Sequence, residues 1–448
     1  MKKVLSFMLV FVLLFSVVGC SNTETSEGTE EENASEEVTE EVKVQEAAPN
    51  EGDTLVVWTF TDELKDIIED YYVANNDLDY EVDVVVVPNE NYQAKLDPAL
   101  GSGKSAPDVF AVEAGYAKKY VDSEFTKDLT EIGINPDEID TMEYVMEVAT
   151  SPEGELKGLS WQATPGAYFY RRSLAQEYLG VSEPEEVQAL ISDFDKFYET
   201  GKIIKEKSNG ETKIVSSLGD FTRVFLSARE DAWVEDGKFI IDPKVEELME
   251  IGKKFNQDEL TQDAQQWTET WFSGMSSDST FGYFLPTWGL HFVLKPNSEN
   301  ADTGETTFGD WGMVQGPSPY FWGGTWLTVR EGTEMEQAAY DLIHYLTMDE
   351  EFLTQYAKDS GDLLSNTVVV NEIKDDFSEP FLDGQNHYAL FAEMAKHIDA
   401  STMTGSDLDI EDLFEEQLVA YTKGEKSKEE ALEDFRSNVK NSFPNLEQ

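Results

Sequence analysis

Nine tryptophans stand out among the side chains of this 448-residue chain, because several lie at the ends of predicted strands, at breaks or in loops. The flat face of an indole packs well against an apolar surface such as the C–H face of a sugar ring. Carboxylate, amide and guanidinium groups that converge beside such rings orient a ligand by hydrogen bonds. Burial in a core is the alternative for each ring. The tryptophans concerned are Trp58, Trp161, Trp288, Trp311, Trp322 and Trp326.

Sequence patterns for nucleophilic, metal and nucleotide chemistry are missing or incomplete. There is no Gly-x-Ser-x-Gly turn and no His-Glu-x-x-His helix, and the four histidines lack metal-ligand spacing. The glycine-rich segment 101–105 has Pro98 where a phosphate loop needs its first glycine. The acids from Asp407 to Glu411 lack the glycine and the final glutamate of a calcium loop. We expect no catalysis, metal or cofactor, although a pair of carboxylates acting as a glycosidase stays open.

The first 20 residues are typical of an export signal. Lys2 and Lys3 precede an apolar run from Val4 to Val18, and Cys20, the only cysteine, closes the segment. The run is shorter than the roughly 20 apolar residues that span a bilayer. A cysteine at this place resembles the lipobox of bacterial lipoproteins, an ordinary signal peptide being the alternative. The resemblance implies cleavage before Cys20, a lipid such as palmitate on its sulfur, and anchoring at the outer face of the cell membrane, the periplasmic side in a Gram-negative cell.

Acidic residues dominate the rest of the chain. Residues 21–52 contain 11 glutamates, one lysine and no aromatic residue, so we expect residues 20–52 to form a disordered acidic tether. Residues 53–448 carry a net charge of −50 from 80 acidic and 30 basic residues. This charge disfavours nucleic-acid binding, which needs basic side chains against phosphates. Because no further cysteine is available for disulfides, packing alone has to stabilise the core.

The hydrophobic pattern after the tether predicts an α/β fold. Strands alternate with helices, a rhythm that favours a parallel sheet with its ligand at the carboxyl ends of the strands. The break at Pro165-Gly166 within extended structure predicts a crossing between two lobes. The predicted strands are 55–58, 80–87, 108–112, 156–161 and 167–170, with more extended structure in 279–294 and 311–329; the predicted helical regions are 64–72, 92–100, 171–272 and 336–443.

The whole body resembles the extracellular solute-binding proteins of bacterial ABC importers, in the carbohydrate-binding, maltose-binding-protein-like branch of family 1. Matching segments occur in order along the chain: the strand ending in Trp58, GKSAPDVF at 103–110, GLSW at 158–161 with YFYR at 168–171, WFSGM at 271–275, residues 282–289, GGTW at 323–326 and SGDLL at 360–364. The resemblance implies a two-lobed periplasmic-binding-protein fold with hinge strands and a ligand cleft between the lobes. The lobes expected from it are 53–162 plus 279–325 and a second, mostly helical one, 163–278 plus 326–448.

The same resemblance directs Trp58, Trp161 and Trp288 toward the cleft. Together with nearby polar and aromatic side chains they form the predicted ligand site. For each polar member, a surface or lobe-stabilising ion pair is the alternative. The full set is Trp58, Glu113, Trp161, Gln162, Tyr168, Asp220, Arg223, Trp288, Trp322, Trp326 and Asp362.

The function that these expectations favour is a monomeric, lipid-anchored binding protein. It would capture a carbohydrate, more readily an oligosaccharide than a monosaccharide, and deliver it to the permease subunits of an ABC transporter in the membrane. Two alternatives remain open. The acidic body favours a peptide, a polyamine or another cationic solute, and a secreted hydrolase would need two carboxylates about 5 to 10 Å apart. A cell-wall adhesin, which would lack a closed cleft between lobes, is a third and weaker alternative.

Overall fold

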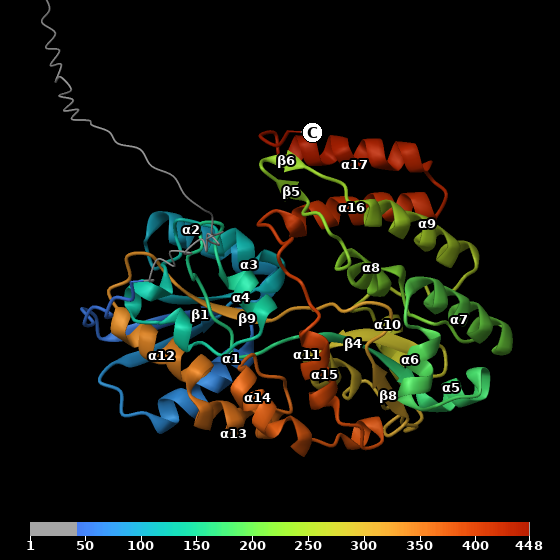
Figure 1. The fold of residues 1–448 in the computed structure, drawn as a ribbon, viewed down its shortest axis with the longest axis horizontal. Coiled ribbons are helices and arrows are strands. Elements are labelled where there is room, and N and C mark those ends of the chain that lie inside the picture. Colours follow the sequence, from blue (N-terminus) through green and yellow to red (C-terminus); the bar gives the residue numbers. More distant parts are fainter. Residues whose placement is uncertain (1–42, 448) are drawn as a thin grey trace, which may run out of the picture. The chain divides into compact units, whose positions relative to one another are not determined.

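A four-stranded sheet is the first structural layer of the chain. The structure is a computed structural model and describes residues 43–447. In this first sheet, toward the left of Figure 1, β1 (Thr54–Thr59) pairs in parallel with β2 (Glu81–Val86) and β3 (Val109–Glu113). A later strand, β9 (Thr325–Val329), pairs antiparallel with β3. The first four residues of β3 are buried, as in a strand covered on both faces.

Helices begin directly at the carboxyl ends of β1 and β3. Thr61 caps α1 (Asp62–Ile67), which continues into the π-helical turn η1 (Ile68–Val73). Glu113 caps α3 (Ala114–Val121) by accepting a hydrogen bond from the Gly115 amide over 2.8 Å. Because both helices start at one edge of the sheet, their first turns face the same space. Further helical segments follow β2, β3 and β9 in the chain: α2 (Asn89–Ser102), η2 (Leu129–Ile132), η3 (Pro136–Glu138), α4 (Glu143–Ala149), α12 (Glu336–Met348), α13 (Glu350–Ser360), α14 (Thr367–Ile373) and η6 (Lys374–Asp376).

Three antiparallel strands form the second sheet, in the order β7 (Gly282–Pro286), β4 (Gly166–Arg171) and β8 (Trp311–Val314). Its side chains alternate between two buried clusters, so that Phe169 belongs to one core and Tyr168 to the other. The N-terminus of β4 needs a glycine, since a Cβ on Gly166 would lie 1.9 Å from the Tyr320 ring. This close approach fixes the 320–325 segment against the sheet.

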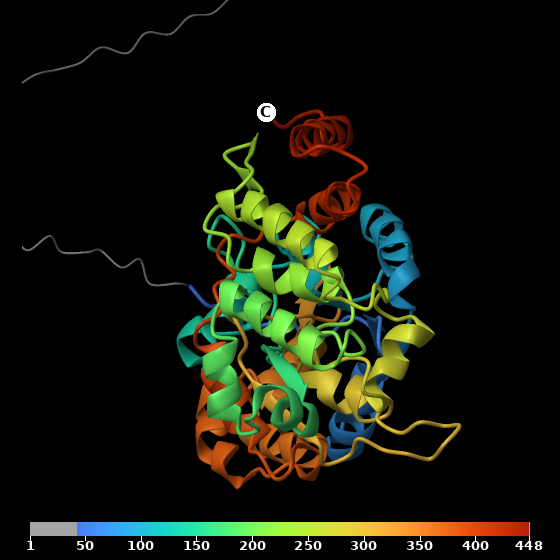
Figure 2. The same cartoon turned by 90° about the vertical axis from the view of Figure 1, so that its right-hand side faces the viewer.

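Helices cover the second sheet and extend beyond it. In Figure 2, α16 (Asp407–Thr422) and α17 (Lys428–Ser442) run side by side at the top, and α16 also packs against α9 (Pro243–Gln257). The remaining elements are α5 (Arg172–Leu179), α6 (Pro184–Leu190), α7 (Phe194–Lys207), α8 (Leu218–Leu226), β5 (Val234–Glu235), β6 (Lys238–Phe239), α10 (Glu269–Ser273), η4 (Gly274–Ser276), α11 (Thr287–Gly289), η5 (Leu290–Leu294), η7 (Pro380–Leu382) and α15 (His387–Ala395).

The predicted division of the lobes is wrong for three strands. Strands β7 and β8, assigned to the first lobe, pair with β4 in the second sheet, whereas residues 326–329 of β9, assigned to the second lobe, pair with β3 in the first. A buried strand's hydrophobic pattern does not reveal which distant strand it joins. The predicted strand at 156–161 forms only isolated bridges, among them Leu159 with Leu327. The segment 159–166 nevertheless runs from the first sheet to the second, as the Pro-Gly break predicts.

The predicted tether also ends earlier than expected. Residues 45–51 pack along the first lobe without regular secondary structure. The amide of Gln45 donates to the Thr130 carbonyl over 2.8 Å, and Asn50 accepts from the Ala338 amide over 3.0 Å in the first turn of α12. These hydrogen bonds offset the entropy that residues 45–51 lose on becoming ordered, and the amino-acid composition of the segment does not reveal them. The export signal, Cys20 and tether residues 21–42 lie outside the described residues.

Candidate functional site

A cavity of about 900 Å³ lies where β1 and β3 end and extends to α8. Its lining comes from the loop after β1, from α1 and η1, from the end of β3, from α8 and α13, and from the segments that cross between the sheets. Seven aromatic and five acidic residues are among the lining residues, which include Phe60, Asp62, Glu63, Asp66, Asp70, Tyr71, Glu113, Gln162, Arg223, Gln266, Trp267, Trp288, Phe292, Trp322 and Tyr356.

Three tryptophans form an aromatic wall of this cavity. The ring centroids of Trp288 and Trp322 lie 5.3 Å apart, and those of Trp267 and Trp288 lie 6.3 Å apart with nearly parallel planes. The indole N–H of Trp288 donates to the Trp322 carbonyl over 3.0 Å, which fixes the ring. A Cβ on Gly323, whose φ is +74°, would lie 2.9 Å from that indole nitrogen, so only glycine fits there.

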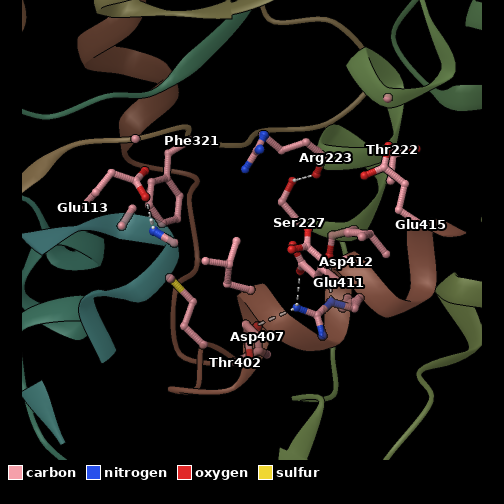
Figure 3. Close-up of a pocket in the computed structure, with 18 of the residues that line it drawn as sticks. Glu113, Thr222, Arg223, Ser227, Phe321, Thr402, Asp407, Glu411, Asp412 and Glu415 are labelled. Atoms are coloured by element: carbon pink, nitrogen blue, oxygen red, sulfur yellow. Dashed lines mark hydrogen bonds and ion pairs between the residues drawn. The ribbon is translucent and has the colours of Figure 1, made fainter. Parts of the chain in front are cut away.

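Two charged residues, Arg223 and Glu113, lie beside the aromatic wall. The guanidinium of Arg223, on α8, lies 4.8 Å from the centre of the Trp322 ring. Arg223 and Glu113 also line a narrower cavity of about 200 Å³, and Figure 3 shows them entering it from opposite sides. Burial raises the pKa of the Glu113 carboxyl, while its bond from Gly115 and the charge of Arg223 lower it. The arrangement offers hydrogen-bonding and charged groups around ring faces.

Behind this wall, buried Asp220 holds the segment that carries Gln266 and Trp267. Its carboxylate accepts hydrogen bonds from Gln266 Nε2 over 2.7 Å, from Trp271 Nε1 over 3.1 Å and from the Ser217 amide over 3.0 Å. Burial raises the pKa of the Asp220 carboxyl to about 6, although these hydrogen bonds lower it. Asp220 does not line the cavity, and its partners indicate a positioning role instead of the predicted contact with ligand.

Five of the eleven predicted site residues line the cavity: Glu113, Gln162, Arg223, Trp288 and Trp322. Three aromatic predictions lie in the core. Tyr168 donates to the Ile214 carbonyl, Trp326 donates to the Val145 carbonyl, and Trp161 is buried. Because they are shielded from the cavity, these rings match the core alternative.

Trp58 and Asp362 are also placed outside the cavity lining. The side chains of β1 alternate between faces, and half-buried Trp58 packs against the first core. Asp362 is 2% exposed, and neither carboxylate oxygen has a hydrogen-bond partner among the described residues. Burial raises its pKa to about 8, and the nearby charge of Glu63 adds to the increase.

Several lining residues are absent from the predicted set. Phe60 and Asp62 directly follow β1, so the rule that ligands bind at strand ends identifies their position. Trp267 and Phe292 are not expected from the sequence. Trp267 is 52% exposed and lies in a loop, and Phe292 is 62% exposed and lies in the π-helical turn η5. No periodicity marks such positions in a sequence.

Comparison with known proteins decides the family. The family model of the bacterial extracellular solute-binding proteins matches residues 66–380, more than half of the chain. The chain belongs to this family. No curated protein sequence is significantly similar to the chain. The family resemblance predicted from the sequence is thereby confirmed.

Solved structures of low sequence identity share the fold of this solute-binding protein. An extracellular solute-binding protein of family 1 is 20% identical, with a TM-score of 0.74 over 88% of this chain and 100% of its own. The ABC transporter associated binding protein from B. animalis subsp. lactis Bl-04, in complex with beta-1,6-galactobiose, is 19% identical, with a TM-score of 0.66 over 88% and 98%. The galacto-N-biose-/lacto-N-biose I-binding protein from Bifidobacterium longum is 14% identical, with a TM-score of 0.68 over 89% and 100%.

The described part of this solute-binding protein supplies two further observations. No helix within residues 43–447 is long and apolar enough to cross a membrane. In the same range, no group of three or more histidine, cysteine, aspartate or glutamate side chains is arranged to hold a metal ion. The predicted two-lobed α/β fold agrees with the fold of the solved structures.

Proposed function

We propose that this solute-binding protein captures a carbohydrate, preferably an oligosaccharide, and presents it to the membrane permease of an ABC importer. The observation that carries the proposal is the wall of Trp267, Trp288 and Trp322 beside a 900 Å³ cavity. Indole faces suit the C–H faces of sugar rings, and Glu113, Gln162 and Arg223 supply groups for hydroxyls. The saccharides named for the structural neighbours support the same ligand class.

The binding step that we propose is closure of the two lobes around the sugar. The cavity is lined by residues of the first sheet and its helices and by α8, which packs on the second sheet, so a ligand that contacts both sides favours the closed arrangement by its differential affinity. The permease then recognises the closed form. No bond is made or broken in this proposal, and the monomer is the functional unit. Anchoring through a lipid on Cys20 at the outer face of the membrane belongs to the same proposal.

A thermal-shift screen tests the proposal. Mono- and oligosaccharides, amines and short peptides are added to the purified soluble chain, and a ligand at 100 times its dissociation constant stabilises the fold by about 2.7 kcal/mol. We expect at least one saccharide to raise the melting temperature, and Trp288→Ala to abolish that increase without unfolding the protein. A screen in which only peptides respond contradicts the carbohydrate assignment.

A second candidate, a cationic solute such as a polyamine, is favoured by one observation. Asp62, Glu63, Asp66 and Asp70 all line the cavity from α1 and η1. A polyamine would contact these carboxylates and would leave the tryptophan faces with little to bind. The amines in the same screen distinguish the two candidates.

A further inference from the structure

The wall of the cavity formed by α1 and η1 is an acidic stripe. Asp62, Asp66 and Asp70 recur at every fourth position, which places them on one face of the helix, and all three line the cavity. Glu63, one residue after the first of them, lines it too and accepts a hydrogen bond from Tyr356 Oη over 2.7 Å. Like charges at this spacing repel one another along a helix.

The carboxylates of this stripe have no protein counter-ion. Within residues 43–447, neither the four stripe residues nor Glu113 forms an ion pair, although ion pairs are common elsewhere on the chain, including Lys65 with Glu69 on the same helix. Arg223 is the single basic residue in the described cavity lining, and its guanidinium lies over Trp322. The same cavity therefore has both an acidic wall and an aromatic wall.

A buried acceptor without a donor accompanies the acidic wall. Gln162 lines the cavity and is 4% exposed, and its Oε1 has no hydrogen-bond partner within residues 43–447. Buried polar atoms in native proteins are nearly always paired. An acceptor in this state calls for a donor from outside the chain.

We propose that the ligand is a saccharide that carries one or more protonated amines. This inference rests on the proposed function and names its substrate class. An ammonium group has three donors and no acceptor, and its charge strengthens each bond to a carboxylate. Sugar rings lie against Trp267, Trp288 and Trp322, while the ammonium groups face Asp62, Asp66 and Asp70.

Matched ligand pairs test this assignment by isothermal titration calorimetry at low salt and a pH of about 6, where the amines are protonated. The pairs are glucose with glucosamine, galactose with galactosamine, and diacetylchitobiose with the disaccharide of glucosamine. We expect the charged member to bind at least tenfold more tightly in every pair that binds. Added salt should reduce this preference, because it screens the exposed carboxylates.

A charge-matched pair of variants locates the effect. D62N/D66N/D70N removes three carboxylates of the acidic wall, whereas D77N/D79N/D83N removes three exposed carboxylates of the same lobe that do not line the cavity. The first variant should lose about tenfold or more in affinity for the amino saccharide and less than threefold for its neutral counterpart. The second variant should bind both as the unchanged protein does.

The possible outcomes separate this inference from the proposed function. Equal or tighter binding of the neutral members overturns the amine assignment and leaves the carbohydrate function intact. An equal loss of affinity in both triple variants also overturns it, since the protein's general charge would then explain the preference. Binding of spermidine with no saccharide bound at all overturns both proposals together.

Discussion

The carboxylate of Asp220 accepts a hydrogen bond from the Gln266 amide over 2.7 Å, although only Gln266 reaches the cavity. The same carboxylate joins the start of α8 to Trp271, so one buried group fixes two segments that meet at the ligand site. Gln266 and Trp267 occupy one of these segments, and Arg223 follows Asp220 on the other. The geometry of this wall therefore depends on a residue that the ligand does not touch.

Asp220→Asn should weaken ligand binding. An asparagine presents an N–H₂ group to donors that need an acceptor, so at least one of the three bonds is lost. We expect the dissociation constant to rise about tenfold, measured by calorimetry with the best saccharide of the screen.

Ser217→Ala is the matched control for that variant. It removes the hydrogen bond that the Asp220 amide donates to Ser217 Oγ in the capping box of α8 and leaves the bond to Gln266 in place. A loss of about 1 kcal/mol in the free energy of unfolding, with unchanged affinity, is expected. Equal changes of affinity in both variants would show that α8 stability, not the position of Gln266, controls binding.

Trp267→Gly should separate binding from stability. Trp267 is 52% exposed and has a φ of +66°, a backbone conformation that glycine adopts without cost. Removing the ring should lower ligand affinity about tenfold and change the melting temperature by only a few degrees, as calorimetry and thermal denaturation measure. A large loss of stability would instead assign the ring to the core.

Trp326→Ala should lower stability, in contrast to Trp267→Gly, which should lower ligand affinity. This ring is buried between the first sheet and α4, and its indole donates to the Val145 carbonyl over 3.0 Å. We expect a loss of about 3–5 kcal/mol in the free energy of unfolding by urea titration. Trp326→Phe keeps most of the ring and loses the hydrogen bond, so about 1–2 kcal/mol is expected for it. A fully stable Trp326→Ala variant with weakened binding would restore the predicted site role.

Asp362 should make stability depend on pH. Burial raises its pKa to about 8 in the folded protein, against an ordinary value of 3.8, so the folded state retains a proton that the unfolded chain releases. Stability from this group is therefore present at low pH and is lost as pH rises from about 4 to 8, by at most about 1.4 kcal/mol per pH unit.

The variant Asp362→Asn isolates this contribution. Urea titrations at pH 5, 6, 7 and 8 should show that the unchanged protein loses more stability with rising pH than the variant does. Titrating groups distant from residue 362 are common to both proteins and cancel in the difference, whereas Glu63, whose charge acts on Asp362, is part of the difference measured. Parallel curves would mean that the carboxyl titrates alike in the folded and unfolded states.

Local patterns in the sequence predict the three parallel strands of the first sheet well, because β1, α1, β2, α2 and β3 follow one another and each pairs or packs with a near neighbour. The second sheet brings together strands that are more than 100 residues apart, and a pattern at β7 gives no sign that its partner is β4. The same difference applies to the site. Glu113 is found because it ends a strand, whereas Trp267 lies in a loop, beside Gln266, which Asp220 of the distant helix α8 holds by a hydrogen bond.

The aromatic wall gives this protein a built-in optical signal. Trp161, Trp233, Trp271, Trp311 and Trp326 are fully buried, while Trp267, Trp288 and Trp322 border the cavity. A sugar that covers the last three displaces water from their rings, which changes their fluorescence emission against a constant background from the buried five. Ligand capture could therefore be followed in real time, without any dye, on the unmodified protein.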